Sequence, residues 1–338
     1  MKAGVKQISE ITGFSPATVS NALNQKKGVS RKASDEVFRV AKELGYFNTN
    51  TINKIRLVIY KQNGLIIDDT PFFSLLIDGI EQECRASGYE MLITNLDARN
   101  TGYREQAIQI INEPGAAIVL LGTELSPDEL KLFNGAQCPI LLLDYWSIDM
   151  TYNAVLINND DSVRKAVNYL FSKGHRNIGH LGGKFKILGF KQRETGYYSA
   201  MREIGLEINP VYTIELGTTM NGAYLDMLDY LNKKPAPRLP TAFFADNDMI
   251  ALGAMKALLE KGYKIPEDIS IIGFDDLPFC EISSPRLTSL RVPKQEMGRL
   301  AVRKIIDMIK GNDNVHVKIQ VCTEFIERDS VRDISQAH

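Results

Sequence analysis

Two short helices are predicted at the start of the chain, separated by a glycine. The apolar spacing predicts the first over about residues 6–12, and Gly13 then suits a tight turn because glycine tolerates positive φ. Ser15 is a good N-cap and Pro16 a good first residue for the second helix, which runs to about residue 23. The inward-facing positions are Ile8 and Ile11 in the first helix, and Val19 and Leu23 in the second.

A third predicted helix follows Ser30, which is its N-cap, and ends at Gly45. Its apolar stripe consists of Ala33, Val37, Val40, Ala41 and Leu44. Two short helices joined by a glycine turn, with a third to close a core, are typical of a helix-turn-helix. On periodicity alone, a generic three-helix unit explains the pattern equally well.

From Arg56 onward, short β-rich runs alternate with helical periodicity, a pattern typical of parallel sheets covered by helices on both faces. These nearly 280 residues exceed what one sheet usually holds, so we expect two lobes. The predicted strands are 56–60, 91–94, 116–121, 140–143, 178–181, 241–245 and 269–273. Predicted helices include 73–87, 162–172, 194–204, 247–261 and 294–310.

Charge is divided unevenly along the 338 residues, although the formal net charge is only −1. Residues 1–56 hold ten Lys and Arg against four Asp and Glu, which gives +6 and leaves −7 for the rest. A basic head on an acidic body is expected if the head alone meets a polyanion, and a charged surface helix would produce the same signal. No apolar run is long enough to span a bilayer and no signal-peptide core follows Met1, so we expect a cytoplasmic protein without a membrane partner.

The sequence contains no pattern that indicates a catalytic site or a metal site. The four cysteines (Cys84, Cys138, Cys280 and Cys322) form no CxxC pair, and we interpret them as buried thiols rather than disulfide or zinc ligands. The four histidines fall in no metal-binding pattern, and His175 is interpreted as a structural residue before a strand. Gly182-Gly183-Lys184 lacks the spacing of a phosphate loop, and no GxSxG elbow is present. We therefore expect neither an enzyme nor a cofactor.

The head resembles that of the lactose-repressor (LacI/GalR) family. The resemblance runs without a gap from Val5 to Asn24 (VKQISEITGFSPATVSNALN) and continues at Val29-Ser30 and Leu44-Gly45-Tyr46. It implies that Pro16, Ala17 and Asn21 read bases, and that Ser15, Thr18, Ser20, Asn24, Ser30 and Tyr46 contact or approach the DNA backbone. The family often has Arg at the position of Asn21. Since Asn pairs bidentately with adenine and Arg with guanine, the base read there is expected to differ.

The body extends the resemblance to nearly the whole chain, through stretches such as 173–178, 192–197, 245–253 and 265–276. It implies an all-α helix-turn-helix head (1–48), a short linker (49–55) and an α/β body (56–338) like a two-lobed periplasmic binding protein of type I. One lobe would comprise about 56–156 and 288–314, the other about 157–284 and 315–331. The resemblance also implies a homodimer on double-stranded operator DNA, controlled by a small-molecule effector.

Candidate effector-binding residues cluster after predicted strands, where ligands bind in such folds. Asp144, Asn247 and Asp275 offer oxygen acceptors and an amide, Arg193 at a helix start offers five donors, and Phe72, Phe73 and Trp146 offer apolar faces. Each has an alternative interpretation. Asn247 and Asp275 could instead be helix-cap or turn residues, and Arg193 could form a surface ion pair. Phe72 and Phe73 could belong to the hydrophobic core, and Trp146 could pack within its lobe.

We therefore expect a transcription regulator, most simply a repressor, whose effector is a sugar or sugar phosphate. A purine or nucleoside effector, or corepressor control, is the alternative within the same family. A transport binding protein and a sugar-processing enzyme are disfavoured by the head and by the missing catalytic pattern. One departure concerns the linker: the family's short hinge helix with its wedging leucine has no counterpart in Phe47–Ile55, where Asn and Thr favour turns and only Ile52 could act as a wedge.

Overall fold

The computed structural model describes residues 4–23, 29–44, 52–311 and 315–336. Three helices form the head: α1 (Val5–Thr12), α2 (Pro16–Leu23) and α3 (Arg31–Glu43). Gly13 ends α1 with a φ of 73°. The Oγ atoms of Ser15 and Ser30 accept the amides of Thr18 (3.1 Å) and Ala33 (3.3 Å), so both predicted N-caps are confirmed. The head has its own core, made of Ile8, Val19, Ala22, Val37, Val40 and Ala41.

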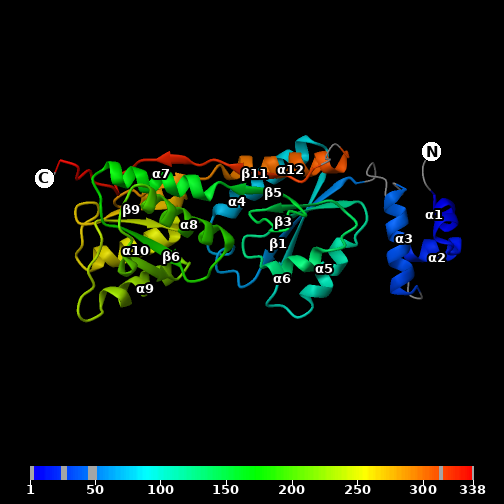
Figure 1. The fold of residues 1–338 in the computed structure, drawn as a ribbon, viewed down its shortest axis with the longest axis horizontal. Coiled ribbons are helices and arrows are strands. Elements are labelled where there is room, and N and C mark those ends of the chain that lie inside the picture. Colours follow the sequence, from blue (N-terminus) through cyan, green and yellow to red (C-terminus); the bar gives the residue numbers. More distant parts are fainter. Residues whose placement is uncertain (1–3, 24–28, 45–51, 312–314, 337–338) are drawn as a thin grey trace.

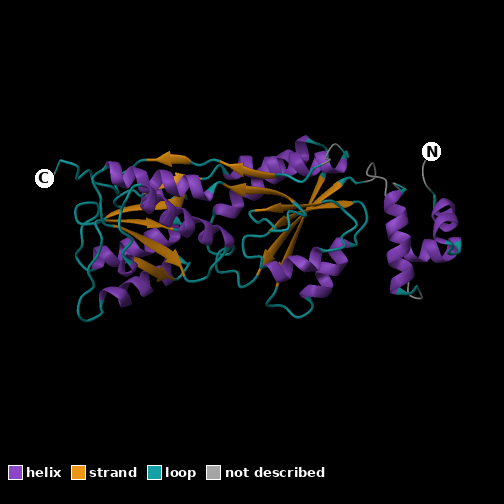
Figure 2. Ribbon diagram, viewed as in Figure 1, coloured by secondary structure: helices purple, strands orange, loops and turns teal. Residues whose placement is uncertain are grey.

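The first sheet of the body is fully parallel, in the order β11-β5-β4-β3-β1-β2. Alternate residues of β3 face opposite sides: Val119 and Leu121 join one hydrophobic cluster, while Ile118 and Leu120 join the other. Helices cover both faces, as Figure 2 shows. The strands are β1 (Lys54–Lys61), β2 (Glu90–Asp97), β3 (Ala116–Leu121), β4 (Ile140–Leu143), β5 (Asn153–Ile157) and β11 (Lys318–Val321). Its helices are α4 (Phe72–Ala86), α5 (Tyr103–Ile111), α6 (Pro127–Leu130), the 3₁₀ turn η2 (Lys131–Phe133) and α12 (Lys294–Ile309).

The second sheet has the order β12-β10-β9-β8-β6-β7 and is parallel except for the antiparallel pair β10–β12. Its strands are β6 (Ile178–Gly183), β7 (Thr213–Leu216), β8 (Ala242–Ala245), β9 (Ser270–Asp275), β10 (Thr288–Arg291) and β12 (Glu324–Ile326). Its helices are α7 (Asn159–Ser172), α8 (Leu188–Glu203), the 3₁₀ turn η3 (Pro210–Tyr212), α9 (Met220–Leu231), α10 (Asp248–Glu260) and α11 (Phe279–Ile282). The predicted α/β body with two lobes is confirmed, and Figure 1 shows the lobes following one another along the long axis.

The chain passes between the two sheets three times: after β5, between β10 and α12, and between β11 and β12. This differs from the expected division of the lobes. Residues 288–291 were expected in the first lobe, but as β10 they pair with β9 in the second sheet. Residues 318–321 were expected in the second lobe, but as β11 they pair with β5 in the first. The local sequence of a strand does not encode which of the two sheets it joins.

The linker, expected at 49–55, is shorter at its end than predicted, because β1 already begins at Lys54. Residues 45–51 lie outside the described part of the chain. Ile52 is half-buried and packs against the main hydrophobic cluster of the body.

None of the described helices is both long and apolar enough to cross a membrane. All four cysteines are free: Cys84 and Cys280 are buried as predicted, Cys138 is half-buried, and Cys322 is exposed, contrary to the expectation.

Candidate functional site

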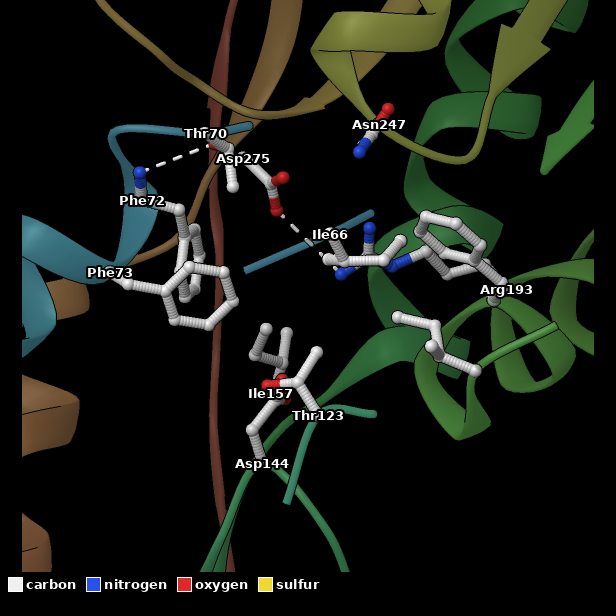
Figure 3. A pocket seen from close by; sticks show the side chains of 12 residues that line it. Ile66, Thr70, Phe72, Phe73, Thr123, Asp144, Ile157, Arg193, Asn247 and Asp275 are labelled. Atoms are coloured by element: carbon white, nitrogen blue, oxygen red, sulfur yellow. Dashed lines mark hydrogen bonds and ion pairs between the residues drawn. The ribbon is translucent and has the colours of Figure 1, made fainter. Parts of the chain in front are cut away.

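A narrow pocket with a cavity volume of about 30 Å³ lies between the two lobes, well below the range of about 300–1,000 Å³ typical of small-molecule sites. It is bounded by segments that follow β1, β3 and β4 in the first lobe and β6, β8 and β9 in the second. Figure 3 shows Phe72 and Phe73 on one side and Arg193 on the opposite side. The lining residues are Ile66, Thr70, Phe72, Phe73, Thr123, Asp144, Ile157, Ile187, Phe190, Arg193, Asn247 and Asp275.

Backbone strain is concentrated at this pocket. Among the described residues, four other than glycine have positive φ, and three of them are Asp144 (58°), Asp275 (107°) and Asp276 (50°). Asp144 follows β4 and Asp275 ends β9, so both lie where parallel strands present their carboxyl ends. Such conformations cost about 1–3 kcal/mol each and cluster at functional sites. The strain therefore supports a ligand-binding role for this edge.

Arg193 is held rigidly in the second lobe. It lies in the second turn of α8, which begins at Leu188, rather than at a helix start as expected. Its Nε donates to Asn159 Oδ1 at 2.8 Å, one terminal nitrogen donates to the carbonyl oxygen of Asp246, and the other lies 3.7 Å from Asp275 Oδ1. The guanidinium also stacks on the Phe274 ring at 3.6 Å. At 4% exposure it is no surface ion pair, so that alternative is wrong.

Two carboxyl groups, the half-buried Asp144 and the buried Asp275, dominate the electrostatics of the pocket. Burial raises the pKa of Asp275 to about 7, although Arg193 and Lys294 partly oppose the effect. Burial also raises the pKa of Asp144, against a 2.7 Å hydrogen bond from the Thr123 hydroxyl and the charge of Arg193. Lys294, at the start of α12, donates to the carbonyl oxygens of Asp275 and Asp276, and burial lowers its pKa. The pocket thus contains two hydrogen-bond acceptors, the Asp144 and Asp275 carboxyl groups, whose burial is only partly offset by nearby donors and cations.

The aromatic and amide candidates serve two roles. Asn247 caps α10, because its Oδ1 accepts the Ile250 amide at 3.0 Å, and it also lines the pocket. Phe72 and Phe73 belong to the hydrophobic core and line the pocket as well, with their rings 5.1 Å apart edge to face.

Trp146 does not join the other candidates. It packs against the second cluster of the first lobe, with the Lys318 ammonium 4.2 Å from its ring, and is not among the lining residues. The lobe-packing interpretation describes it better, since its position two residues after Asp144 carries it past the pocket. His175 is structural as predicted, with its ring nitrogens bonded to Thr241 Oγ1 and the Arg332 carbonyl oxygen.

Sequence reasoning missed several lining residues. Thr123 and Phe190 come from segments that follow β3 and β6, so the position after a strand could have indicated them. Ile66, Thr70, Ile157 and Ile187 have the composition of ordinary core or loop. No group of three or more potential metal ligands occurs among the residues that the structure describes.

The head presents a second candidate surface along the start of α2. Ser15, Pro16, Ala17 and Ser30 are exposed, while Thr18, Ser20 and Asn21 are half-buried. The hydroxyls of Ser15 and Thr18 lie 2.9 Å apart. Asn24 and Tyr46, the other two DNA-binding candidates, lie outside the described residues.

Comparisons with known proteins cover nearly the whole chain. A family model described as "Periplasmic binding protein-like domain" matches residues 167–331. The "HTH-type transcriptional repressor PurR" of Pasteurella multocida is 29% identical over 98% of this chain and 99% of its own. A "transcriptional regulator CelR-cellobiose complex" has a TM-score of 0.73 at 23% identity, covering 97% of this chain and 100% of that one. The lac repressor dimer bound to operator and the anti-inducer ONPF has a TM-score of 0.69 at 19% identity, covering 98% and 100%.

A helix-turn-helix head joined to a two-lobed binding body is the architecture of a DNA-binding transcription regulator. Over nearly its whole length the chain is similar to such regulators, in line with the resemblance of its head to the LacI/GalR family.

Proposed function

We propose that this protein is a cytoplasmic repressor that binds operator DNA as a homodimer and is controlled by a small neutral, hydroxyl-rich ring bound between its lobes. The observation that carries the proposal is that the half-buried carboxyl group of Asp144 and the buried one of Asp275 line the same pocket as phenyl rings. Carboxylates accept hydrogen bonds from ring hydroxyls, and aromatic faces pack against the C–H surface of a sugar.

The charges favour a neutral sugar over a sugar phosphate. Arg193 is the one cation among the lining residues, and Asn159, the Asp246 carbonyl and Asp275 already engage it. A phosphate would approach two acidic side chains without a free positive charge to offset them. The family neighbour whose title names cellobiose is consistent with a carbohydrate.

A purine or nucleoside is the second candidate. Phe72, Phe73 and Phe190 offer ring surfaces for a base, and Asp275 offers an acceptor for its N–H groups. The relatives that carry the name PurR also favour this alternative.

A thermal-shift panel tests the effector proposal, because a ligand that binds only the native state raises Tm. The panel contains glucose, ribose, cellobiose, glucose 6-phosphate, adenine, guanine and hypoxanthine. We expect a neutral sugar to raise Tm and to change operator affinity in a gel shift with the protein's own promoter region. A shift with purines alone would favour the second candidate, and a shift with glucose 6-phosphate alone would contradict the charge argument.

In the head, we propose that Pro16, Ala17 and Asn21 read bases. The residues proposed to contact or approach the DNA backbone are Ser15, Thr18, Ser20, Asn24, Ser30 and Tyr46. One short helix reads few bases, and a two-fold symmetric dimer doubles the contact. We expect footprints at two half-sites about 34–36 Å apart, and binding that weakens with salt at a slope of about −0.9 per neutralised phosphate. Protection of a single half-site at saturation would contradict the dimer.

A further inference from the structure

The side chain of Glu124, in the first lobe, is a buried carboxylate that has no ion-pair partner among the described residues and does not line the pocket. Glu124, in the turn after β3, is 2% exposed. Its Oε2 accepts the amides of Gln62 (2.9 Å), Asn63 (3.1 Å) and Gly64 (2.9 Å). Its Oε1 accepts those of Ile66 (3.0 Å) and Ile67 (3.2 Å). Five backbone donors therefore converge on a single side chain.

These donors all belong to the segment between β1 and α4, residues 62–71. The same segment forms part of the pocket wall through Ile66 and Thr70, and leads into Phe72, whose amide donates to Thr70 Oγ1 at 3.3 Å. The neighbour of Glu124 on the chain, Thr123, reaches the pocket and bonds Asp144. Glu124 thus lies directly behind the part of the wall that an effector would meet.

The shape of this segment depends on an anion. Successive backbone amides that point inward form a nest, which binds negative charge. Gly64 makes the nest possible with a φ of 74°, which glycine adopts without strain. The outer ties of the segment, Arg99 to the Asn63 carbonyl at 3.0 Å and Lys61 to Asp68 at 2.5 Å, are solvent-accessible and hold it weakly. Without Glu124, five buried or half-buried donors would have to find other partners.

We infer that Glu124 is a positioning residue for effector recognition: its carboxylate holds residues 62–71 in the conformation that shapes the first-lobe wall of the pocket. The inference rests on the proposed effector function of that pocket. Glu124 does not line the pocket itself; it acts through Ile66, whose backbone amide it accepts, and through Thr70 further along the same segment.

The test uses the full-length protein with Glu124→Gln, Glu124→Ala and the control Glu129→Gln. Glutamine keeps the shape of the side chain but replaces one carboxylate oxygen by an amide NH2 group, which donates, so some of the five backbone amides lose their acceptor. Glu129 lies five residues further on and accepts from Tyr103 and Arg104 side chains rather than from the loop backbone. Hydrogen exchange is measured at amides 62–72, together with operator affinity without added compound, which should stay unchanged in all three variants.

We expect exchange in Glu124→Gln to be at least about tenfold faster at amides 62–67 and also faster at 68–72, with no change in Glu129→Gln. In Glu124→Ala, sodium acetate should slow this exchange again by filling the nest, whereas acetamide and sodium chloride at equal concentration should not. Each panel compound that raises the Tm of the wild type should bind Glu124→Gln at least about tenfold more weakly.

Unchanged exchange at 62–67 in Glu124→Gln would overturn the inference. A second outcome would also overturn the inference: faster exchange at 62–67, but unchanged exchange at 68–72 and unchanged affinity for the panel compounds. Glu124 would then stabilise only its own turn and would not position the pocket wall. If no panel compound binds the wild type but acetate restores protection across 62–72, the effector assignment fails while the positioning of the wall by Glu124 is supported.

Discussion

Asp275→Asn is expected to make the protein more stable and unresponsive at once. The substitution keeps the size of the side chain and removes its charge. Asp275 is 7% exposed, and its carboxyl has a pKa of about 7 against an ordinary value of 3.8. The native protein therefore holds this proton more tightly than the unfolded chain does, so the wild type loses stability as the pH rises from about 4 to about 7.

The size of the effect follows from the pKa difference. Each pKa unit corresponds to about 1.4 kcal/mol, so about three units imply a loss of up to about 4 kcal/mol that is complete above pH 7 and absent below pH 4. The asparagine variant has no such loss. Its advantage in the free energy of unfolding should therefore grow by about 2–3 kcal/mol between pH 5 and pH 8. The charge of Asp248, whose pKa burial also raises, contributes to the raised pKa of Asp275, so the difference between the two proteins reports on this pair of carboxyl groups together.

Urea unfolding at pH 5 and pH 8, followed by circular dichroism, measures this difference. The same variant should retain operator affinity and lose the response to the compounds that bind the wild type, because a carboxylate acceptor is gone from the pocket. An equal free-energy difference at the two pH values, or a variant less stable than the wild type at pH 8, would refute the reasoning about burial. Such a trade between stability and binding is typical of functional sites.

Three further outcomes are expected. Asn21→Ala should relax base preference at one symmetric pair of operator positions, at about 1–3 kcal/mol per half-site, while Thr18→Ala weakens all sequences equally; identical profiles on a randomised operator library would contradict the assignment. Arg193→Ala should weaken effector binding by roughly 2–5 kcal/mol, measured by calorimetry, and should leave operator binding without effector unchanged. Unchanged effector affinity would show that the effector binds elsewhere. Ile52→Ala should leave operator bending unchanged in a circular-permutation assay, because Ile52 packs on the body, and loss of a sharp wild-type bend would reveal a hinge wedge.

Complete burial helps to identify a strand but does not suffice, because the fully buried β5 and the mostly buried β10 were not predicted. The predicted bounds of β3 and β4 agree with the structure, because every residue of both strands is buried and apolar. The edge strands β7, β11 and β12 were missed, since each has three or four residues with exposed positions and gains its β-structure from a neighbour. The helix α9 was missed as well, and its described burial is limited to Ala223 and Met227.

The pocket could be predicted in its polar part and not in its apolar part. Asp144, Asn247 and Asp275 follow or end strands, and strand ends meet at one edge of a parallel sheet. Ile66 and Ile187 instead reach the pocket because loops fold back over it, which depends on contacts such as those of Glu124 with a segment about 60 residues earlier. Trp146 shows the converse, since nearness in sequence to Asp144 did not bring it into the pocket.

The three passages of the chain between the lobes have a consequence for biosynthesis. The last two strands, β11 and β12, complete one sheet each, and both are made only after residue 317. On the ribosome, the head can close its core of residues 8–41 early, while neither lobe has all its strands until the final part of the chain emerges. In a nascent chain, the helix-turn-helix head can therefore fold long before the two lobes of the body are complete. Premature termination near residue 310 would remove an edge strand from both lobes at once and leave unpaired strand edges that invite aggregation.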